Sequence, residues 1–417
     1  MLNNYLKKCN DVLDNLITQG KGLAMTTDIF ICSPVRTAIG TFNGTLKNTP
    51  APRLGAVVVG ETLKRAGLAA DKVQAVVMGH VVQAGAAMNP ARQAAIYGGV
   101  PVNVPAYTVN RVCGSGAQAI VSAYLEIASG NIQCAIAGGM ENMDLCPYLL
   151  PSARWGYRMG DGKTSDSMLL DGLHDAFSGN HSGWHTEDLA EKYSISREEQ
   201  DEWALRSQQL FSKAQAEDKF TAEITPVEIT SRKGIELFQK DEHNRPDTTA
   251  ETLAKLKPAF RKEGTITAGN APGLNSAAAA MIVADEDFVS SHHLQPMARI
   301  VAYGISAVEP GLFGIGPVPA VKQALERAKW QIQDVQRVEI NEAFAAIAIA
   351  VAKELNLDEQ IVNVEGGAIA HGHPIGATGA ILTTRLIHSM KRDGLKRGIV
   401  TLCIGGGQGI ALALEIL

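Results

Sequence analysis

Cys113 is the first residue whose type and setting could support chemistry. It lies in Asn110-Arg-Val-Cys-Gly-Ser-Gly, where an apolar strand is predicted to turn into a helix. A helix N-terminus presents free N–H groups and partial positive charge, which favour the thiolate over the thiol and can bind an oxyanion. A cysteine at a glycine-rich turn is more often structural, so this motif alone does not assign a nucleophile.

His373 could act as a base in Gly366-Gly-Ala-Ile-Ala-His-Gly-His-Pro-Ile-Gly-Ala-Thr-Gly. Pro374 suits the first position of a helix, which predicts that His373 lies at or next to the N-cap. The positive helix end disfavours imidazolium there and leaves a neutral ring that can accept a proton. A histidine that only caps the helix is the alternative. His371 competes for the role, but no proline follows it and we expect it to point to the other face.

Cys403 and Asn341 are further candidates. Cys403 ends an apolar strand before a glycine-rich turn, and a thiol there can shuttle a proton because its ordinary pKa is about 8.5. A small buried hydrophobic residue is the alternative. The glycines also suggest a dinucleotide-binding loop, but such a loop should open a helix, whereas residues 410–417 continue as a strand. Asn341 follows the short strand Arg337–Ile340 and can either cap the next helix or hold a water.

The elements that must position these residues alternate between short apolar strands and helices. This rhythm predicts an α/β fold with a largely parallel sheet covered by helices. The predicted strands of this rhythm are Asp28–Val35, Ala75–Val81, Ala106–Val112, Cys134–Met140 and Met297–Ile305, and the predicted helices are Pro52–Gly67, Asn89–Gly98 and Gly114–Ser129. The pattern lapses from about Asn142 to Pro272, which predicts an inserted lobe with a helix opened by a capping box of Ser196 and Glu199.

The two ends of the chain resemble each other. One strand is predicted to run into the Cys113 turn and a helix, and a second strand, Val362–Ile369, into the His373 turn and a helix. Each unit is followed by a strand that ends in glycines. An internal duplication with a pseudo-twofold axis would bring Cys113 and His373 together.

Composition narrows the class of protein. Of 417 residues, 46% are hydrophobic and 19% charged, and the net charge of −5 argues against a general nucleic-acid binder. No pair of cysteines has CxxC spacing, so neither a metal site nor a disulfide framework is predicted. No apolar run is long enough to span a membrane.

Residues 1–24 carry one apolar stripe at helical spacing, which predicts a helical extension without a targeting signal and a cytoplasmic protein.

Together the motifs resemble the thiolase family, in particular its acetyl-CoA acetyltransferase members, from about Asp28 to Leu417. Further segments fit the family in the same order: Pro34-Val-Arg-Thr-Ala-Ile-Gly, Asn89-Pro-Ala-Arg-Gln-Ala, Ala137-Gly-Gly-Met-Glu-Asn-Met and Thr265-Ile-Thr-Ala-Gly-Asn-Ala. The resemblance implies a five-layered αβαβα fold of two similar halves with an inserted loop domain. The expected parts are residues 25–142 with 275–294, the loop domain 143–274, and residues 295–417.

The resemblance also implies roles for these residues. Cys113 would take an acetyl group from acetyl-CoA after His373 removes its proton, and Cys403 would deprotonate a second acetyl-CoA for condensation to acetoacetyl-CoA and CoA. One oxyanion hole would use His373 and a water held by Asn341, the other the N–H groups of Cys113 and Gly405. Positions that match CoA contacts are Leu173, His181, Arg232, Phe260, Ala268, Ala343 and Phe344. No permanently bound cofactor is expected, and members are usually homotetramers, sometimes homodimers.

Several positions depart from the family pattern and put the acyl length in question. Pro272 stands where many acetyl-specific members have a serine, Phe313 where a methionine often lines the acyl pocket, and His371 replaces an aliphatic residue. A degradative 3-ketoacyl-CoA thiolase of fatty-acid β-oxidation that acts on longer chains is therefore the main alternative. Ketoacyl synthases lack the second cysteine, and an NAD-dependent dehydrogenase would need an early strand–GxGxxG–helix unit. A noncatalytic scaffold would have no need of these four polar groups.

Overall fold

The computed structural model describes residues 27–232 and 234–417. The predicted helical extension over residues 1–24 lies outside this part of the chain. Within the described residues, no helix combines the length and the apolar character needed to cross a membrane.

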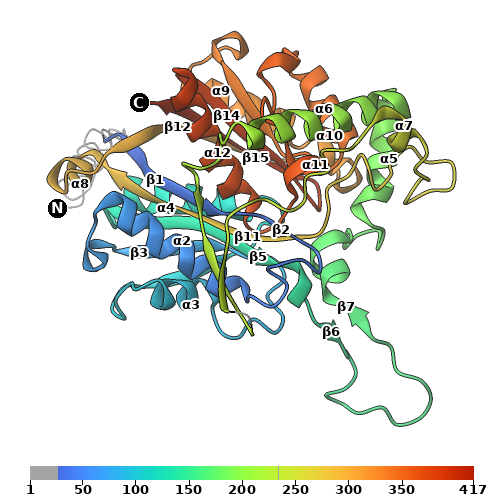
Figure 1. Ribbon diagram of the computed structural model, residues 1–417, viewed down its shortest axis with the longest axis horizontal. Coiled ribbons are helices and arrows are strands. Elements are labelled where there is room, and N and C mark those ends of the chain that lie inside the picture. Colours follow the sequence, from blue (N-terminus) through green and yellow to red (C-terminus); the bar gives the residue numbers. More distant parts are fainter. Residues whose placement is uncertain (1–26, 233) are drawn as a thin grey trace, which may run out of the picture.

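One large mixed sheet organises the molecule (Figure 1). Its main strands are β1 (Ile29–Thr37), β3 (Ala75–Gly79), β4 (Ala106–Val109), β5 (Cys134–Asn142), β11 (Asn275–Asp285), β12 (Pro296–Ala307), β13 (Arg337–Ile340), β14 (Arg397–Ile404) and β15 (Gln408–Ile416). Their order is β13-β14-β15-β12-β1-β11-β5-β3-β4, and the short strands β2 (Gly40–Thr41) and β8 (Ile224–Thr225) pair with β11 and β1.

The prediction of a largely parallel sheet is wrong for its centre. Only the outer pairs, β13 with β14 and β3 with β4 and β5, are parallel among these nine main strands, and the pairs between them are antiparallel. The connection from β14 to β15 shows the reason. It is a short glycine turn, which can only return the chain antiparallel, whereas a parallel pair needs a long crossover.

The strand order repeats between the two ends of the chain. The path β1-β11-β5-β3 in the first half corresponds to β12-β15-β14-β13 in the second. The prediction of a strand over Val362–Ile369 is wrong, because in this range only Val362 forms a β-bridge, to Val338. The chain then turns at Gly366, which has a φ of 74° and lies so close to helix α6 (Arg197–Ala216) that an added Cβ would be 2.4 Å from a backbone oxygen. A short helix, α11 (Ala368–His371), replaces the rest of the strand.

Helices complete a five-layered arrangement (Figure 1). The outer layers contain α2 (Ala51–Ala66) and α3 (Pro90–Tyr97) on one side, and α9 (Pro317–Ala328) and α10 (Ala345–Glu354) on the other. Helices α4 (Ser115–Ala128) and α12 (Thr378–Asp393) pack together between the two halves of the sheet, within one apolar core. Glycine allows this contact: a Cβ at Gly379 would lie 2.3 Å from the backbone nitrogen of Ala117. The starts of α4 and α12 are therefore neighbours.

Residues 143–274 hold smaller elements. They include α5 (Ser182–Lys192), α6 (Arg197–Ala216), α7 (Ala250–Ala254), a π-helix (Met168–Leu173), and the pairs β6 (Tyr148–Leu149) with β7 (Ser165–Asp166) and β9 (Val227–Ser231) with β10 (Gly234–Phe238). The capping box of Ser196 and Glu199 is present at the start of α6, as predicted. The chain between β6 and β7 forms an arm that projects from the body (Figure 1).

Short helices connect the remaining elements. They are α8 (Glu286–Ser291) and the 3₁₀ turns η1 (Ala70–Lys72), η2 (Met143–Leu145), η4 (Pro310–Ile315), η5 (Ile332–Asp334) and η6 (Glu359–Ile361).

Candidate active site

An apolar pocket of about 240 Å³ brings together residues from both halves of the fold and from the inserted segment. Cys113, His373 and Gly405 line it. So do six positions expected to contact CoA: Leu173, His181, Phe260, Ala268, Ala343 and Phe344. The seventh, Arg232, is exposed on the β9–β10 hairpin and is not part of the pocket lining. His181 stacks on Phe260 at 4.6 Å between ring centroids, which builds an aromatic wall.

A strained turn presents Cys113 to this pocket. Val112 has a φ of 44°, which is unusual for a β-branched residue and costs on the order of 1–3 kcal/mol. Ser115 holds the turn, because its Oγ accepts from the N–H of Arg111 at 2.9 Å and donates to the carbonyl of Val112 at 2.7 Å. Gly114, the N-cap of α4, packs on Ile404, where a Cβ would come within 2.5 Å. The turn therefore lies directly against the end of β14.

The thiol of Cys113 is protonated at rest, contrary to the expectation of a thiolate. Burial raises its pKa to about 11, and the charge of Glu141 acts in the same direction. The backbone N–H groups of Gly405 and of Cys113 itself donate to the sulfur and lower the pKa, but burial outweighs them. The helix end considered from sequence is too weak to offset this desolvation. A base must therefore remove the proton.

His373 is suited to that task, although not for the reason predicted. Helix α12 begins at Thr378 with Ala377 as its N-cap, so His373 lies several residues before the helix. Burial, rather than the helix end, lowers its pKa to about 4 and keeps the ring neutral. Its Nδ1 lies 2.7 Å from Thr378 Oγ1, whose hydroxyl hydrogen is directed at the carbonyl of Pro374. Nδ1 must then carry the ring hydrogen, which leaves Nε2 free to accept a proton.

Asn341 and Cys403 lie next to these groups. Asn341 Nδ2 is 3.4 Å from His373 Nε2. Its Oδ1 is buried and has no partner among the described residues, so it can accept from a water. Helix α10 begins at Ala345 with Phe344 as N-cap, so the alternative that Asn341 caps it is wrong. Cys403 is fully buried in β14; burial raises the pKa of its thiol, and so does the neighbouring Cys113.

Comparisons with known proteins agree with this architecture. The family of the thiolase N-terminal domain matches residues 29–287, and that of the thiolase C-terminal domain matches residues 294–416. The chain belongs to the thiolase family. The resemblance inferred from the sequence motifs is therefore confirmed, and with it the fold class.

Individual relatives are similar over nearly their whole length. An acetyl-CoA acetyltransferase from Pseudomonas aeruginosa is 50% identical over 93% of this chain and 99% of its own. One from Cupriavidus necator is 49% identical, also over 93% of this chain and 99% of its own. The crystal structure of the Bacillus anthracis acetyl-CoA acetyltransferase has a TM-score of 0.92 and 46% identity, and covers 94% of this chain and 99% of its own.

Asn275 and Thr378 hold the thiolase histidine in place, and the sequence motifs did not single them out for this. The N–H of His373 donates to Asn275 Oδ1 at 2.9 Å, and Gly372, with a φ of 100°, packs so tightly on this amide that a Cβ would be 2.4 Å from it. Thr378 is close to His373 in sequence, so its hydroxyl was a detectable signal. Asn275 is almost a hundred residues away and had no such signal.

Glu342 is a second residue that sequence reasoning missed. It follows Asn341 and is fully buried. Its carboxylate accepts from Trp203 Nε1, Ser207 Oγ, Asn363 Nδ2 and the N–H of Ile369, at 2.8–3.0 Å. These donors lie on α6, on the chain after β13 and on α11. Glu342 thus ties the inserted segment to the chain that leads into His373.

His371 is not part of the pocket lining, in line with the expectation that it points elsewhere. Its ring lies 6.0 Å from that of Phe211, and neither ring nitrogen has a partner among the described residues. Burial, with the positive charges of Arg385 and Arg36, lowers its pKa well below the ordinary value. His371 is therefore a buried neutral ring outside this pocket.

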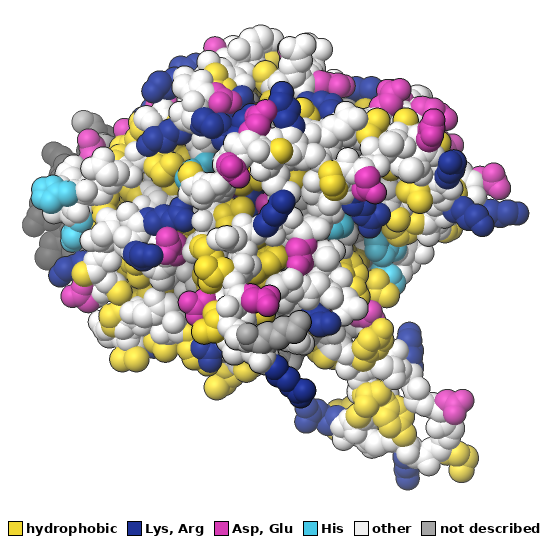
Figure 2. Space-filling view, viewed as in Figure 1, with side chains coloured by type: hydrophobic (Ala, Val, Ile, Leu, Met, Phe, Trp, Pro, Cys, Tyr) yellow, Lys and Arg dark blue, Asp and Glu magenta, His cyan; other side chains and the backbone are white. Residues whose placement is uncertain are grey.

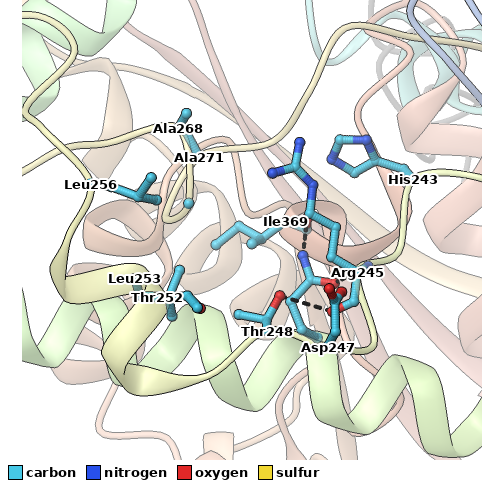
Figure 3. A pocket seen from close by; sticks show the side chains of 12 residues that line it. His243, Arg245, Asp247, Thr248, Thr252, Leu253, Leu256, Ala268, Ala271 and Ile369 are labelled. Carbon is cyan, nitrogen blue, oxygen red and sulfur yellow. Dashed lines mark hydrogen bonds between the residues drawn. The ribbon is translucent and has the colours of Figure 1, made fainter.

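A second cavity of about 210 Å³ adjoins the pocket (Figure 3). Figure 3 shows His243 and Arg245 on one side and Leu253 and Leu256 on the other. Ala268 and Ala271 line both cavities, so the turn that carries them forms the partition. In the part of the chain that the structure describes, no group of three or more His, Cys, Asp or Glu side chains could hold a metal ion.

Proposed function

We propose that this thiolase condenses two acetyl-CoA molecules to acetoacetyl-CoA and CoA, or catalyses the reverse thiolysis, through an acetyl group carried on Cys113. The observation that carries the proposal is one pocket in which the Cys113 sulfur receives two backbone N–H groups and a neutral histidine presents an Nε2 that carries no hydrogen. Relatives of about 50% identity are named acetyl-CoA acetyltransferase, which supports the same reaction.

Acetylation is the first half of the proposed reaction. His373 Nε2 takes the Cys113 proton, and the sulfur attacks the carbonyl carbon of acetyl-CoA. The bond from that carbon to the CoA sulfur breaks, and Cys403 gives its proton to the departing CoA. The N–H groups of Cys113 and Gly405, which already converge on the sulfur, would bind the oxyanion. Each such donor can lower the activation free energy by about 3–4 kcal/mol.

Condensation starts from the protonation states that acetylation leaves, a Cys403 thiolate and a protonated His373. Cys403, now a thiolate, removes a proton from the methyl carbon of a second acetyl-CoA. The protonated His373 and a water bound by Asn341 would stabilise the enolate oxygen, consistent with the unpartnered Asn341 Oδ1. The enolate carbon attacks the acetyl carbon, the bond to Cys113 breaks, and His373 returns its proton to the sulfur. Atoms and protons balance, and each residue regains its starting form.

The acyl chain length follows from the pocket walls. Phe313 and Pro272 both line the pocket, and Phe313 is buried. A bulky ring in the pocket that Cys113 lines favours short acyl groups, and the relatives described above are named acetyl-CoA acetyltransferases. The degradative thiolase with longer substrates is accordingly not favoured. Thiolysis rates on a series from acetoacetyl-CoA to long 3-ketoacyl-CoA should fall with chain length, and a rate that rises with length would contradict this specificity.

We further infer a cytoplasmic homotetramer or homodimer that holds no permanent cofactor. The arm between β6 and β7 supports association, because its Trp155 and Met159 are exposed at 84% and 98%. Figure 2 shows hydrophobic side chains on the surface of this arm. Such apolar exposure marks a contact surface. Light scattering of the purified chain should give an oligomer, and a variant in which Trp155 and Met159 are both changed to Ser should give a smaller species.

Incubation with labelled acetyl-CoA tests the reaction itself. Wild type should gain one acetyl group in its intact mass, and Cys113→Ala should gain none. Cys32→Ala, which removes a buried thiol of β1, is the matched control and should label like wild type. Equal labelling of wild type and Cys113→Ala would contradict the proposal.

A further inference from the structure

Glu141 is a buried carboxylate that the reaction scheme leaves without a role. It lies near the end of β5 and is fully buried. Its Oε2 accepts from the N–H of Val81 at 3.0 Å and of Gly376 at 2.9 Å, and its Oε1 accepts from the N–H of Val82 at 3.3 Å. His80 Nε2 lies 3.1 Å from Oε1. One side chain thus collects donors from the end of β3 and from a turn nearly three hundred residues later.

Both sets of donors belong to segments that shape the pocket. Val81, Val82 and Ile375 form a small apolar cluster against which Cys113 packs. Ile375 and Gly376 follow His373 in the turn that leads to α12. Glu141 therefore connects the surface on which the Cys113 thiol rests to the turn that carries the base.

Close backbone packing makes this connection sensitive to small changes. A Cβ at Gly376 would lie 2.6 Å from Glu141 Oε2, and a Cβ at Gly139 would lie 2.2 Å from the carbonyl oxygen of Gly376. The turn is thus seated directly on the ends of β3 and β5, with the carboxylate as its hydrogen-bond acceptor. A shift of the turn would move His373 relative to Cys113.

We propose that Glu141 is a positioning residue of the thiolase reaction, which sets the geometry between the Cys113 thiol and the His373 imidazole by binding Val81, Val82 and Gly376 at once. This inference rests on the proposed acetyl transfer through Cys113. Glu141 touches neither substrate nor the reacting atoms in this scheme. Its charge also reaches Cys113, whose pKa it raises.

Glu141→Gln is the first test. The amide keeps the shape but has one acceptor oxygen in place of two, so the N–H groups of Val81, Val82 and Gly376 can no longer all be bound at once, and the spacing of the two turns must change. The rate of Cys113 acetylation at saturating acetyl-CoA should fall about 10- to 100-fold, as expected for small misplacement, with KM within about twofold. Acetylation at the wild-type rate in folded Glu141→Gln would overturn the inference. Wild type that takes up no acetyl group would instead contradict the proposed function, before any variant is compared.

The pH dependence of alkylation separates positioning from loss of stability. Without the charge of Glu141, alkylation of Cys113 by iodoacetamide should move to lower pH. Among the described residues, His80 and Cys146 also interact with Glu141, Cys403 interacts with Cys113, and His373 lines the same pocket. All four remain in the variant. An unchanged alkylation midpoint in the variant would contradict the inference.

Two more variants guard against a folding defect. Gly376→Ala disrupts the hydrogen bond from Gly376 N–H to Glu141, because its Cβ would lie 2.6 Å from Oε2, but it keeps the charge of Glu141. Acetylation should therefore slow while the alkylation midpoint stays. Acetylation at the wild-type rate would overturn the inference.

Asp241→Asn is the control. It alters another buried carboxylate, which pairs with Arg36 and accepts from the N–H of Ile39. Measured on folded protein, it should acetylate like wild type, and a loss equal to that of Glu141→Gln would overturn the inference.

Discussion

The Cys113 turn and the His373 turn occupy equivalent places in the repeated topology, yet they position their side chains by different kinds of contact. In the first turn, the strained backbone at Val112 places the Cys113 sulfur next to the N–H groups of Gly405 and of Cys113 itself. The second keeps an imidazole still through side-chain partners, Thr378 on the ring and Asn275 on the backbone. Both reactive groups are neutral at rest because burial penalises their charged forms.

A topology that repeats within one chain can thus supply both partners of the proposed proton transfer. A nucleophile needs donors aimed at the charge that develops on its substrate, and backbone N–H groups provide these. A base needs one defined tautomer and a lone pair that faces the donor, which a hydroxyl partner provides. The same packing of α4 against α12 serves both turns.

The largest expected effect separates the two cysteines. Cys403→Ala should still take up an acetyl group on Cys113, because CoA can leave as a thiolate that solvent then protonates. Condensation and thiolysis should fall by about 10²- to 10⁴-fold, the usual range for a lost acid–base group. Intact mass after incubation with acetyl-CoA and a steady-state thiolysis assay measure the two steps. Cys134→Ala, another fully buried thiol in the sheet, serves as control and should keep both. A Cys403→Ala enzyme that condenses normally would exclude this role.

A smaller effect concerns the histidine tautomer. Thr378→Val removes the acceptor of the Nδ1 hydrogen, so the ring can turn or change tautomer, and acetylation should slow by up to about tenfold for one hydrogen bond. Thr384→Val is a matched control, because Thr384 is also buried on α12 and bonds only to the carbonyl of Ala380 in the described structure. Burst kinetics with acetyl-CoA measure the difference. If both variants slow equally, the hydroxyl of Thr378 has no special part in the reaction.

The smallest effect on activity, and a gain in stability, is expected at His371. His371→Leu replaces a buried ring without partners by an apolar side chain, which should raise the free energy of unfolding by about 1–3 kcal/mol. Urea denaturation at pH 7 measures this change. His243→Leu is the contrast, since His243 Nε2 accepts from the N–H of Gly273 and its loss should destabilise. A His371→Leu variant less stable than wild type would show that the ring has a partner.

The same variant has a pH signature. The folded-state pKa of His371 lies well below the ordinary value of 6.5, so below about pH 6.5 the unfolded chain binds a proton that the folded chain does not. Wild type must therefore lose stability as the pH falls from 7 toward 5. His371→Leu lacks this contribution, so its advantage should widen with acidity. A constant advantage across these pH values would contradict the lowered pKa.

Much of the fold, and the candidates for the reactive residues, could be predicted from local patterns. The strand at Cys134, the helix after Cys113 and the capping box at Ser196 each depend on neighbours within a few residues, so the sequence shows them directly. Predictions failed where distant contacts decide. The expected strand at Val362–Ile369 became a helix because Gly366 packs on α6, and the sheet centre is antiparallel.

The family and the candidate reactive side chains could be recognised in the sequence alone, because the thiols, the imidazole and the glycine turns stand in the order of the thiolase motifs. The protonation states of these side chains depend on the folded structure. The helix ends considered from sequence would favour a thiolate at Cys113, whereas burial raises the pKa of its thiol to about 11. Desolvation depends on segments far apart in the chain that close over one pocket, and no local pattern records how they meet.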